Sequence, residues 1–371
     1  MLVKPEIERF AKIRVVGVGG AGGNVLNSMI ESQQITGVEF IAINADAQDL
    51  SINKAPIKIP IGHELTGGLG CGADPTLGKK AGEESEGVIR SNLEGADMVF
   101  ITAGMGGGTG TGAAPVVARI AKEAGALTIG VVTKPFAFEG AQRLKNAELG
   151  IDALRSEVDA LITIPNEKLL EIADETMSII EAFKLSDSVL NQGVQGIADL
   201  IVMPGLINVD FADVRTIMKD AGTALMGIGI GTGETRAEEA ARAAISSPLL
   251  EQNIEDATGI LFNVVGGNDL AMKEVDRAAN IIRGIASADA NIIFGTSIDE
   301  KLSGQMKITV IATGFETEES PIKTAIRESF APREQFTSLE EGVSKGKESP
   351  KETPSGDLDS KYDIPAFLRG K

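Results

Sequence analysis

Short apolar runs alternate with Gly-rich stretches and helix-period segments along the first half of the chain. Residues 12–18 predict a buried strand, and the apolar positions Val25, Met29 and Ile30 after it predict a helix. Further strands are predicted at 38–43, 97–102, 126–133 and 161–164, with a helix at 113–124. Strands that alternate with helices are typical of an α/β fold with a mainly parallel sheet.

Residues 176–203 have a different pattern. Apolar residues there lie on more than one face of the predicted helix, namely Ile179, Ile180, Phe183, Val189, Leu190, Val194, Ile197, Leu200 and Ile201. A long helix that is apolar on several sides is normally buried between two layers or domains. We therefore predict a central core helix that ends at Pro204-Gly205.

Strand and helix signals resume after this helix and predict a second, smaller α/β unit. They lie at 223–230, 235–245, 259–265, 272–286, 291–296 and 306–313. A chain of 371 residues exceeds the size at which one hydrophobic core usually stops growing. The predicted organisation is an N-terminal extension (1–11), a first domain (12–175), the core helix (176–203) and a second domain (204–315).

The periodic pattern of apolar positions ends at Glu316. Residues 316–361 are charged with scattered apolar positions, which predicts a mostly disordered linker. The last ten residues, 362–371, regain large apolar groups at Tyr362, Ile364, Phe367 and Leu368. A short amphipathic motif on a flexible tether is a common partner ligand, although a solvated terminus is the alternative.

Charge and rare residues exclude several function classes. There are 35 Lys and Arg against 53 Asp and Glu, a net charge of −18, which argues against broad nucleic-acid binding. Cys71 and His63 are the single cysteine and histidine, so an intramolecular disulfide, a multi-cysteine zinc cage and a two-His metal site are excluded. Without an apolar run near 18 residues or a signal-peptide core, we expect a reducing, cytosolic protein that does not insert into a membrane.

Two Gly-rich loops each lie between a predicted strand and a predicted helix. The first contains Gly17-x-Gly19-x-x-Gly22, a weak dinucleotide fingerprint that is also compatible with a tight turn. The second spans 103–112, where so many glycines would cost considerable backbone entropy if they formed only a turn. Two such loops on adjacent strands indicate one polyphosphate held between them, and the P-loop pattern is absent.

The segment Gly106 to Gly112, Gly-Gly-Gly-Thr-Gly-Thr-Gly, resembles the signature loop of the tubulin and FtsZ superfamily. Four other segments look like bacterial-type FtsZ: 44–48, 133–136, 164–169 and 205–214. So does the tail from Asp363 to Arg369. The resemblance covers about residues 12–315 plus the tail. It implies a Rossmann-like GTP-binding domain, a long central helix and a second domain with a catalytic loop.

The resemblance also implies the ligands and their contacts. GTP or GDP is expected, with Mg²⁺ carried by the nucleotide rather than by direct side-chain ligands. The implied nucleotide contacts are Gly20, Ala21, Gly22, Gly23, Asn24, Asn44, Asp46, Gly104, Gly106, Gly107, Gly108, Thr109, Gly110, Thr111, Pro135, Glu139, Arg143, Asn166, Phe183 and Asp187. Glu139 and Arg143 lie four residues apart, so a surface ion pair is the alternative for them.

Phe183 and Asp187 also lie four apart on one helix face. An aromatic ring can stack on a base, and a carboxylate can accept both the N1–H and the N2–H of guanine. Adenine lacks that donor pair, so Asp187 favours GTP over ATP. A partly exposed helix acid without a ligand is the alternative.

The resemblance places catalysis in a loop that reaches the GTP of the neighbouring subunit. Its candidate residues are Asn208, Asp210 and Asp213, and the two acids have helical spacing i, i+3. Two carboxylates there could orient the attacking water, since phosphoryl transfer mainly needs positioning and charge compensation. Ordinary capping of a helix by Asp210 is the alternative, and both roles can coexist.

The resulting hypothesis is a GTPase that polymerises head to tail into the cytokinetic ring of prokaryotic cell division. Residues Tyr362 to Arg369 are expected to bind a membrane-tethering, FtsA-like adaptor at the mid-cell division site. A dinucleotide-dependent oxidoreductase is a rival, disfavoured by the second Gly-rich loop and the near-absence of His. A nucleotide-binding scaffold without useful turnover and a tubulin-like protein of plasmid segregation or cell shape are further alternatives.

Overall fold

The computed structural model describes residues 11–32, 35, 37–171, 176–202, 205, 207, 209–247, 249–250, 257–287 and 289–315. Several predictions lie outside these residues. They concern Asn208, the linker at 316–361, the tail motif at 362–371 and nearly all of the N-terminal extension.

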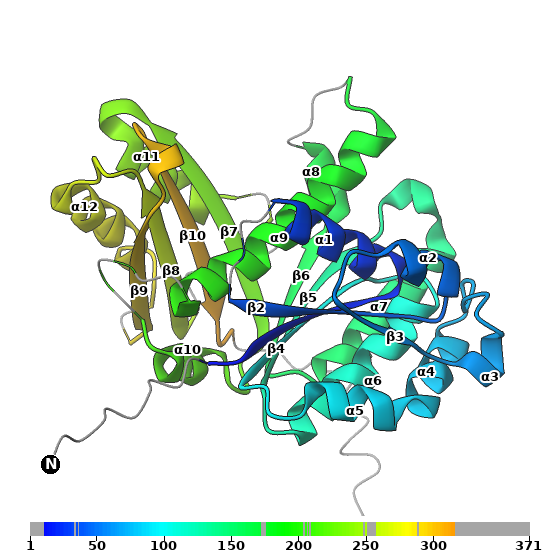
Figure 1. The fold of residues 1–371 in the computed structure, drawn as a ribbon. Helices are drawn as coiled ribbons and strands as arrows, with labels where there is room; N and C mark the ends of the chain where they lie inside the picture. Colours follow the sequence, from blue (N-terminus) through cyan, green and yellow to red (C-terminus); the bar gives the residue numbers. More distant parts are fainter. Residues whose placement is uncertain are drawn as a thin grey trace, which may run out of the picture. The chain divides into compact units, whose positions relative to one another are not determined.

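Ten strands of the described residues form one sheet in the order β3-β2-β1-β4-β5-β6-β7-β10-β8-β9 (Figure 1). Their bounds are β1 Ile13–Val18, β2 Val38–Asn44, β3 Ile57–Pro60, β4 Met98–Gly104, β5 Leu127–Lys134, β6 Ala160–Pro165, β7 Gly222–Thr232, β8 Gly259–Gly266, β9 Asn291–Ile298 and β10 Gln305–Thr313. Strands β1 to β7 pair in parallel, which confirms the predicted α/β fold with a mainly parallel sheet. β10 instead lies antiparallel between β7 and β8, and β8 pairs in parallel with β9.

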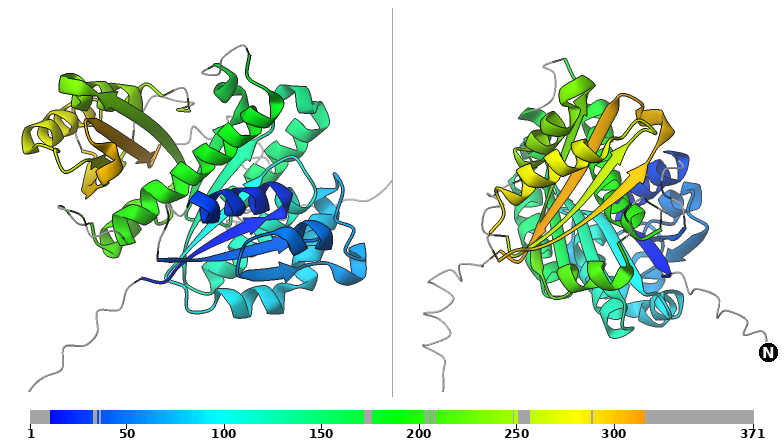
Figure 2. Two further views of the ribbon diagram at one scale, coloured as in Figure 1. Left: turned by 45° about the horizontal axis from the view of Figure 1, so that its top comes forward. Right: turned by 90° about the vertical axis from the view of Figure 1, so that its left-hand side faces the viewer.

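The helices cover both faces of the sheet (Figures 1 and 2). Their bounds are α1 Gly19–Ser32, α2 Ala47–Ile52, α3 His63–Thr66, α4 Pro75–Glu84, α5 Glu86–Leu93, α6 Thr109–Glu123, α7 Ala141–Arg155, α8 Asn166–Glu171, α9 Ile179–Val202, α10 Phe211–Met218, α11 Arg236–Ile245 and α12 Met272–Arg283. On β1, Val15 packs in a core with α1 and α9, whereas the next residue, Val16, packs in a second core with α5 and α6. Burial on both faces explains why this strand is a nearly continuous apolar run.

The predicted core helix is α9, which packs against both halves of the sheet. A Cβ atom at Gly193 would lie 3.2 Å from Sδ of Met226 on β7, and one at Gly196 would lie 2.9 Å from Cγ2 of Thr309 on β10. Glycine at these positions lets the helix approach the strands closely. The second half of the sheet has its own core, in which α11 and α12 cover β8 and β10.

Several elements were not predicted from the sequence, including β3, α4 and α5. Helix α4 contacts α6 through glycine rather than through an apolar face. A Cβ atom at Gly78 would lie 2.3 Å from the carbonyl oxygen of Gly108. A periodic apolar pattern is therefore absent where the two helices meet most closely.

Candidate functional site

A cavity of about 610 Å³ lies at the carboxyl ends of the parallel strands. Gly19, Asn44, Gly104, Thr133 and Asn166 line it from the ends of β1, β2, β4, β5 and β6. Ligands of open α/β sheets bind at this edge, because the loops and the first turns of the following helices meet there.

The two Gly-rich loops touch each other beneath this cavity. A Cβ atom at Gly19, whose φ is +74°, would lie 2.8 Å from the backbone nitrogen of Gly110. One at Gly104 would lie 2.6 Å from Cβ of Ala21. Helices α1 and α6 begin at Gly19 and Thr109, so both N-termini with their free N–H groups lie at the cavity. This arrangement favours a bound anion with several oxygens.

A third loop closes one side of the cavity. Leu69, Gly70, Cys71 and Gly72 line it. The backbone N–H of Gly108 donates to the carbonyl of Gly72 at 3.0 Å, so this loop is bonded to the second Gly-rich loop.

Two acids at the start of α2, the N-cap Asp46 and Asp49 in its first turn, also line the cavity. Asp46 caps α2, because its Oδ1 accepts from the N–H groups of Gln48 and Asp49 at 2.9 and 3.1 Å. Asn44 donates through Nδ2 to Oδ2 of Asp49 at 2.7 Å. Burial, and then the charge of Asp46, raise the pKa of Asp49 above its ordinary value.

The far end of the cavity combines aromatic and polar side chains from α9 and its neighbours. Phe183 and Asp187 both line it, as their spacing predicted. The ring of Phe183 meets that of Phe136 edge-on, with centroids 5.4 Å apart, so its orientation is supported from behind. Burial raises the pKa of Asp187 to about 6. The hydroxyl of Ser186 donates to Oδ1 of Asn166 at 2.8 Å, and both residues are buried.

Glu139 and Arg143 form the ion pair that their spacing allows, and they do so at the cavity. Glu139 also accepts from the backbone N–H of Phe136 at 3.0 Å. The carboxylate therefore holds the guanidinium and the β5–α7 connection at the cavity mouth.

The predicted nucleotide contacts as a whole divide into two groups. Those that line the cavity are Gly20, Ala21, Asn44, Asp46, Gly104, Gly107, Gly108, Thr109, Gly110, Pro135, Glu139, Arg143, Asn166, Phe183 and Asp187. Those that do not are Gly22, Gly23, Asn24, Gly106 and Thr111.

Four of the residues outside the lining, Gly22, Gly23, Gly106 and Thr111, have visible structural roles. A Cβ atom at Gly22 would lie 2.5 Å from the carbonyl of Thr102, so this glycine lets α1 pack on β4. The carbonyl of Gly23 accepts from Nδ2 of Asn53 at 2.9 Å. The hydroxyl of Thr111 accepts from the backbone N–H of Gly106 at 2.8 Å, which shapes the second Gly-rich loop from within.

Other residues that line the cavity were not predicted from the sequence. They are Val18, Gly19, Asp49, Met105, Thr133, Ser186 and Leu190. Thr133 and Val18 could have been predicted, because they lie at the carboxyl ends of predicted parallel strands. For Ser186 the sequence offers no indication beyond its position next to Asp187.

The predicted catalytic acids lie elsewhere. Asp210 is the N-cap of α10 and accepts from the backbone N–H of Asp213 at 3.0 Å, which confirms the capping role. Both side chains are exposed, and α10 contributes nothing to the cavity lining. Within one chain these carboxylates do not contact a molecule in the cavity.

The described residues contain neither a cluster of metal-ligating side chains nor a helix that could span a membrane. No group of three or more His, Cys, Asp or Glu side chains in that part of the chain is arranged to hold a metal ion. None of the helices described there is both long and apolar enough to span a membrane.

Comparisons with known proteins agree with this geometry. The model of the Tubulin/FtsZ family, GTPase domain, matches residues 12–174, and that of the FtsZ family, C-terminal domain, matches residues 222–316. An empty FtsZ dimer from M. jannaschii is 46% identical, with a TM-score of 0.80, over 84% of this chain and 90% of that one. A point mutant of M. jannaschii FtsZ gives the same identity and TM-score over 83% and 92%.

A more distant structure shares the fold alone. It is CetZ2 from Haloferax volcanii, described as a GTPγS-bound protofilament, with 24% identity and a TM-score of 0.69 over 86% of this chain and 97% of that one. The two matched domains and the 46% identity over most of both chains lead to one conclusion. This chain belongs to the FtsZ family and is a GTPase of the tubulin/FtsZ type.

Proposed function

We propose that this GTPase binds GTP with Mg²⁺ in the cavity and hydrolyses it where the next subunit docks head to tail. The observation that carries this proposal is the separation of its two parts. The anion-binding loops lie at the cavity, whereas Asp210 and Asp213 lie on a helix that does not line it. A second copy of the chain is therefore needed to bring these two carboxylates to the phosphates.

The polarity of the cavity orients the nucleotide. The N-termini of α1 and α6 attract the phosphates to the Gly-rich loops. Phe183 stacks on the base at the other end, and ionised Asp187 accepts the N1–H and N2–H of guanine. Asn166, held by Ser186, contacts the base or ribose, and the pair Glu139–Arg143 contacts the ribose and the phosphates.

Mg²⁺ fits the acidic side of the cavity. Asp46 and Asp49 line it, and their negative charge would repel a bare triphosphate. A magnesium ion carried by the nucleotide would supply charge compensation in phosphoryl transfer. Asp46 and Asp49 are the side chains that would face this hydrated ion.

Catalysis requires positioning of the attacking water. Asp210 and Asp213 are spaced i, i+3, so both carboxylates project from the first turn of α10 toward the docked subunit. They accept hydrogen bonds from the water and orient its lone pair toward the γ-phosphorus. Asn208, immediately before them, is proposed to assist.

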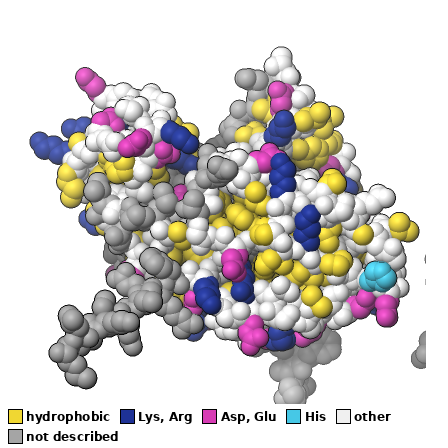
Figure 3. All heavy atoms as spheres, viewed as in Figure 1, with side chains coloured by type: hydrophobic (Ala, Val, Ile, Leu, Met, Phe, Trp, Pro, Cys, Tyr) yellow, Lys and Arg dark blue, Asp and Glu magenta, His cyan; other side chains and the backbone are white. Residues whose placement is uncertain are grey.

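Head-to-tail assembly also accounts for exposed apolar side chains near the cavity mouth. Leu69 is 84% exposed although it lines the cavity. Phe138, Ile179 and Ile180 are exposed as well, and apolar side chains gather around the start of α9 in Figure 3. Because each subunit offers different surfaces at its two ends, the contact does not close and produces filaments. The M. jannaschii FtsZ structure is described as a dimer and that of CetZ2 as a protofilament.

The filament is proposed to form the cytokinetic ring at the mid-cell site in the cytoplasm. The tail, Tyr362 to Arg369, is proposed to dock on an FtsA-like membrane adaptor. Its apolar side chains and Arg369 suit a groove with an acidic rim.

The test measures GTP turnover per molecule against protein concentration in Mg²⁺ buffer, with light scattering in the same cuvette. Turnover should be near zero below a threshold and rise with scattering above it. D210N and D213N should keep GTP affinity and lose most of the turnover, whereas D152N, an exposed acid on α7, should change neither. Turnover that is flat with concentration, or unchanged in D210N and D213N, would refute the shared site and favour a scaffold.

A further inference from the structure

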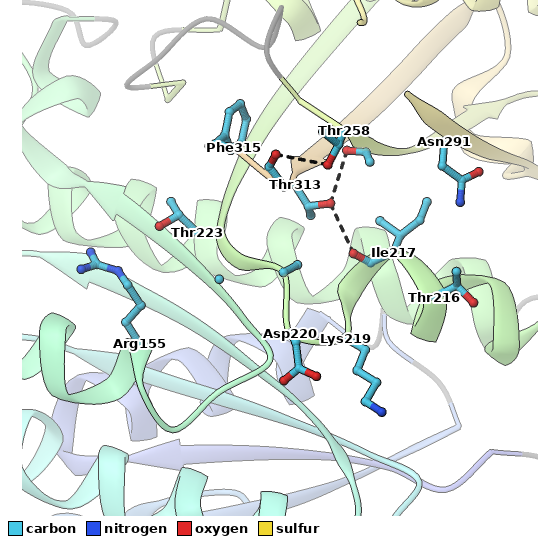
Figure 4. Close-up of a pocket in the computed structure, with 14 residues that line it drawn as sticks. Arg155, Thr216, Ile217, Lys219, Asp220, Thr223, Thr258, Asn291, Thr313 and Phe315 are labelled. Carbon is cyan, nitrogen blue, oxygen red and sulfur yellow. Dashed lines mark hydrogen bonds between the residues drawn. The ribbon is translucent and has the colours of Figure 1, made fainter. Parts of the chain in front are cut away.

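The C-terminal end of α10 borders a second cavity, of about 830 Å³ (Figure 4). Thr216, Ile217, Lys219 and Asp220 line one side of it, and Thr313 and other residues of the second half of the sheet line the opposite side. Ile217 and Met218 at this end of the helix are buried in the core, whereas Thr216, Lys219 and Asp220 are exposed at the cavity.

Hydrogen bonds and an ion pair connect this end of α10 and the start of β7 to β10 on one side and to α6 and the start of β6 on the other. On one side, the hydroxyl of Thr313 on β10 donates to the carbonyl of Ile217 at 3.3 Å (Figure 4). On the other, the backbone N–H of Gly222 donates to the carbonyl of Asp159 at 2.9 Å. Nζ of Lys122 on α6 lies 3.2 Å from Oδ1 of Asp220. Lys122 and Asp220 therefore form a polar side-chain link between α6 and this end of α10, in addition to the apolar packing of Met218.

Lys122 is itself held firmly. Its Nζ lies 3.3 Å from Oδ1 of Asp159 and donates to the carbonyl of Val158 at 3.4 Å. Asp159 is only 4% exposed, and its other oxygen accepts from the backbone N–H of Thr128 at 2.8 Å. Burial by itself lowers the pKa of Lys122, but Asp159 and Asp220 outweigh it and raise the pKa above its ordinary value. The ammonium group stays charged throughout the physiological pH range.

Asp220 has an unusual backbone. Its φ of +52° is the one positive value among the non-glycine residues that the structure describes. Asp and Asn tolerate this left-handed conformation better than other side chains. With Gly222 at +68°, it turns the chain sharply from α10 into β7. The turn directs the carboxylate of Asp220 to Lys122.

Helix α6 connects this link to the nucleotide cavity. It begins at Thr109, which lines the cavity, and Lys122 is in its last turn. A helix of 15 residues is about 22 Å long and rigid. The same element therefore has the Gly-rich loop at one end and the attachment of α10 at the other.

We propose that Lys122 and Asp220 are positioning residues, which hold α10 so that Asp210 and Asp213 meet the GTP of the neighbouring subunit. This inference rests on the proposed shared site. It adds that the placement of the catalytic helix depends on an ion pair at its far end, anchored on the helix that starts at the subunit's own nucleotide.

The test compares D220G with D220N. Glycine adopts the left-handed turn without strain, so D220G removes only the carboxylate and leaves Lys122 paired with Asp159. Asparagine keeps the turn and an oxygen that accepts from Lys122. D220G should lower turnover per polymerised subunit about 3- to 5-fold, with unchanged GTP affinity and unfolding temperature, and D220N should restore most of it. R119A is the matched control, because Arg119 lies one turn earlier on α6 and pairs with Glu86 and Glu123 instead.

Mixed filaments show in which subunit the defect acts. D220G is copolymerised with a large excess of the D210N/D213N double variant, whose own cavity is intact. Because the double variant supplies no catalytic carboxylates, most working sites then combine the cavity of a double-variant subunit with α10 of a neighbouring D220G subunit. Turnover per D220G subunit should stay as low as in pure D220G filaments, relative to wild type in the same mixture.

Three results would overturn the inference: full turnover in D220G, equal loss in D220N, or recovery of wild-type turnover in the mixture. If D210N/D213N alone keeps full turnover, the shared site fails, and the positioning role with it. If the double variant is inactive but D220G is fully active, the shared site stands and only the positioning role is refuted.

Discussion

Gly19 and Gly110 touch through their backbones: a Cβ atom on Gly19 would lie 2.8 Å from the amide nitrogen of Gly110. The first and second Gly-rich loops thus form one continuous floor under the nucleotide cavity. Gly19 also has φ +74°, a conformation that L side chains rarely adopt.

G19A should therefore separate the two loops. The added methyl group meets backbone that cannot rotate away, and the left-handed φ adds strain of about 1–3 kcal/mol. GTP affinity, measured by equilibrium binding of a fluorescent analogue, should fall at least about tenfold. G87A is the control, because nothing lies within 4 Å of a Cβ atom at that helical position. Equal affinities for G19A and wild type would show that the contact between the loops is dispensable.

Asp187 should make guanine binding depend on pH. Burial raises its pKa to about 6, and only the ionised carboxylate accepts the two guanine N–H groups. Lowering the pH from about 7 to about 5 should weaken GDP binding about tenfold through this group, since most of the carboxyl becomes protonated. Calorimetric titrations across this range measure the change.

D187N provides the control for phosphate titration, which both proteins share. The variant should bind GDP more weakly at neutral pH and should lose the additional pH dependence. If the pH profiles of wild type and D187N are parallel, Asp187 does not bind the base.

Asp199 on α9 should make stability depend on pH. Burial is the main cause that raises its pKa to about 7, and Lys307 on β10 opposes the shift. The unfolded chain ionises this carboxyl near pH 4, so between about 4 and 7 the folded protein binds the additional proton. The contribution of Asp199 to the free energy of unfolding therefore falls as the pH rises through this window and is constant above it.

D199N removes this titration. Relative to wild type, its free energy of unfolding from urea titrations should be larger at pH 8 than at pH 5. D152N, which changes an exposed acid, should show the same difference from wild type at both values. A D199N difference that is independent of pH would mean that the carboxyl is ionised throughout.

Much of the fold was predictable because it depends on local patterns. Burial on both faces makes β1 and β4 nearly continuous apolar runs, and close packing on two sides makes α9 apolar on more than one face. Strand β3 escaped prediction, since four residues with Lys58 in the middle give no distinctive pattern. The antiparallel insertion of β10 between β7 and β8 could not be predicted either, because pairing between distant strands leaves no local signature.

The chemistry of the site divides in the same way. The sequence alone determined the two Gly-rich loops and the helical spacing of Phe183 and Asp187, because each depends on neighbouring residues and on the backbone geometry they allow. Only the tertiary structure decided that Ser186 bonds to Asn166 and that Lys122 reaches Asp220. Lys122 and Asp220 are 98 residues apart in the chain. Their contact exists because the sheet and its helices bring the two segments together. No local sequence pattern indicates which distant segments become neighbours in the folded chain.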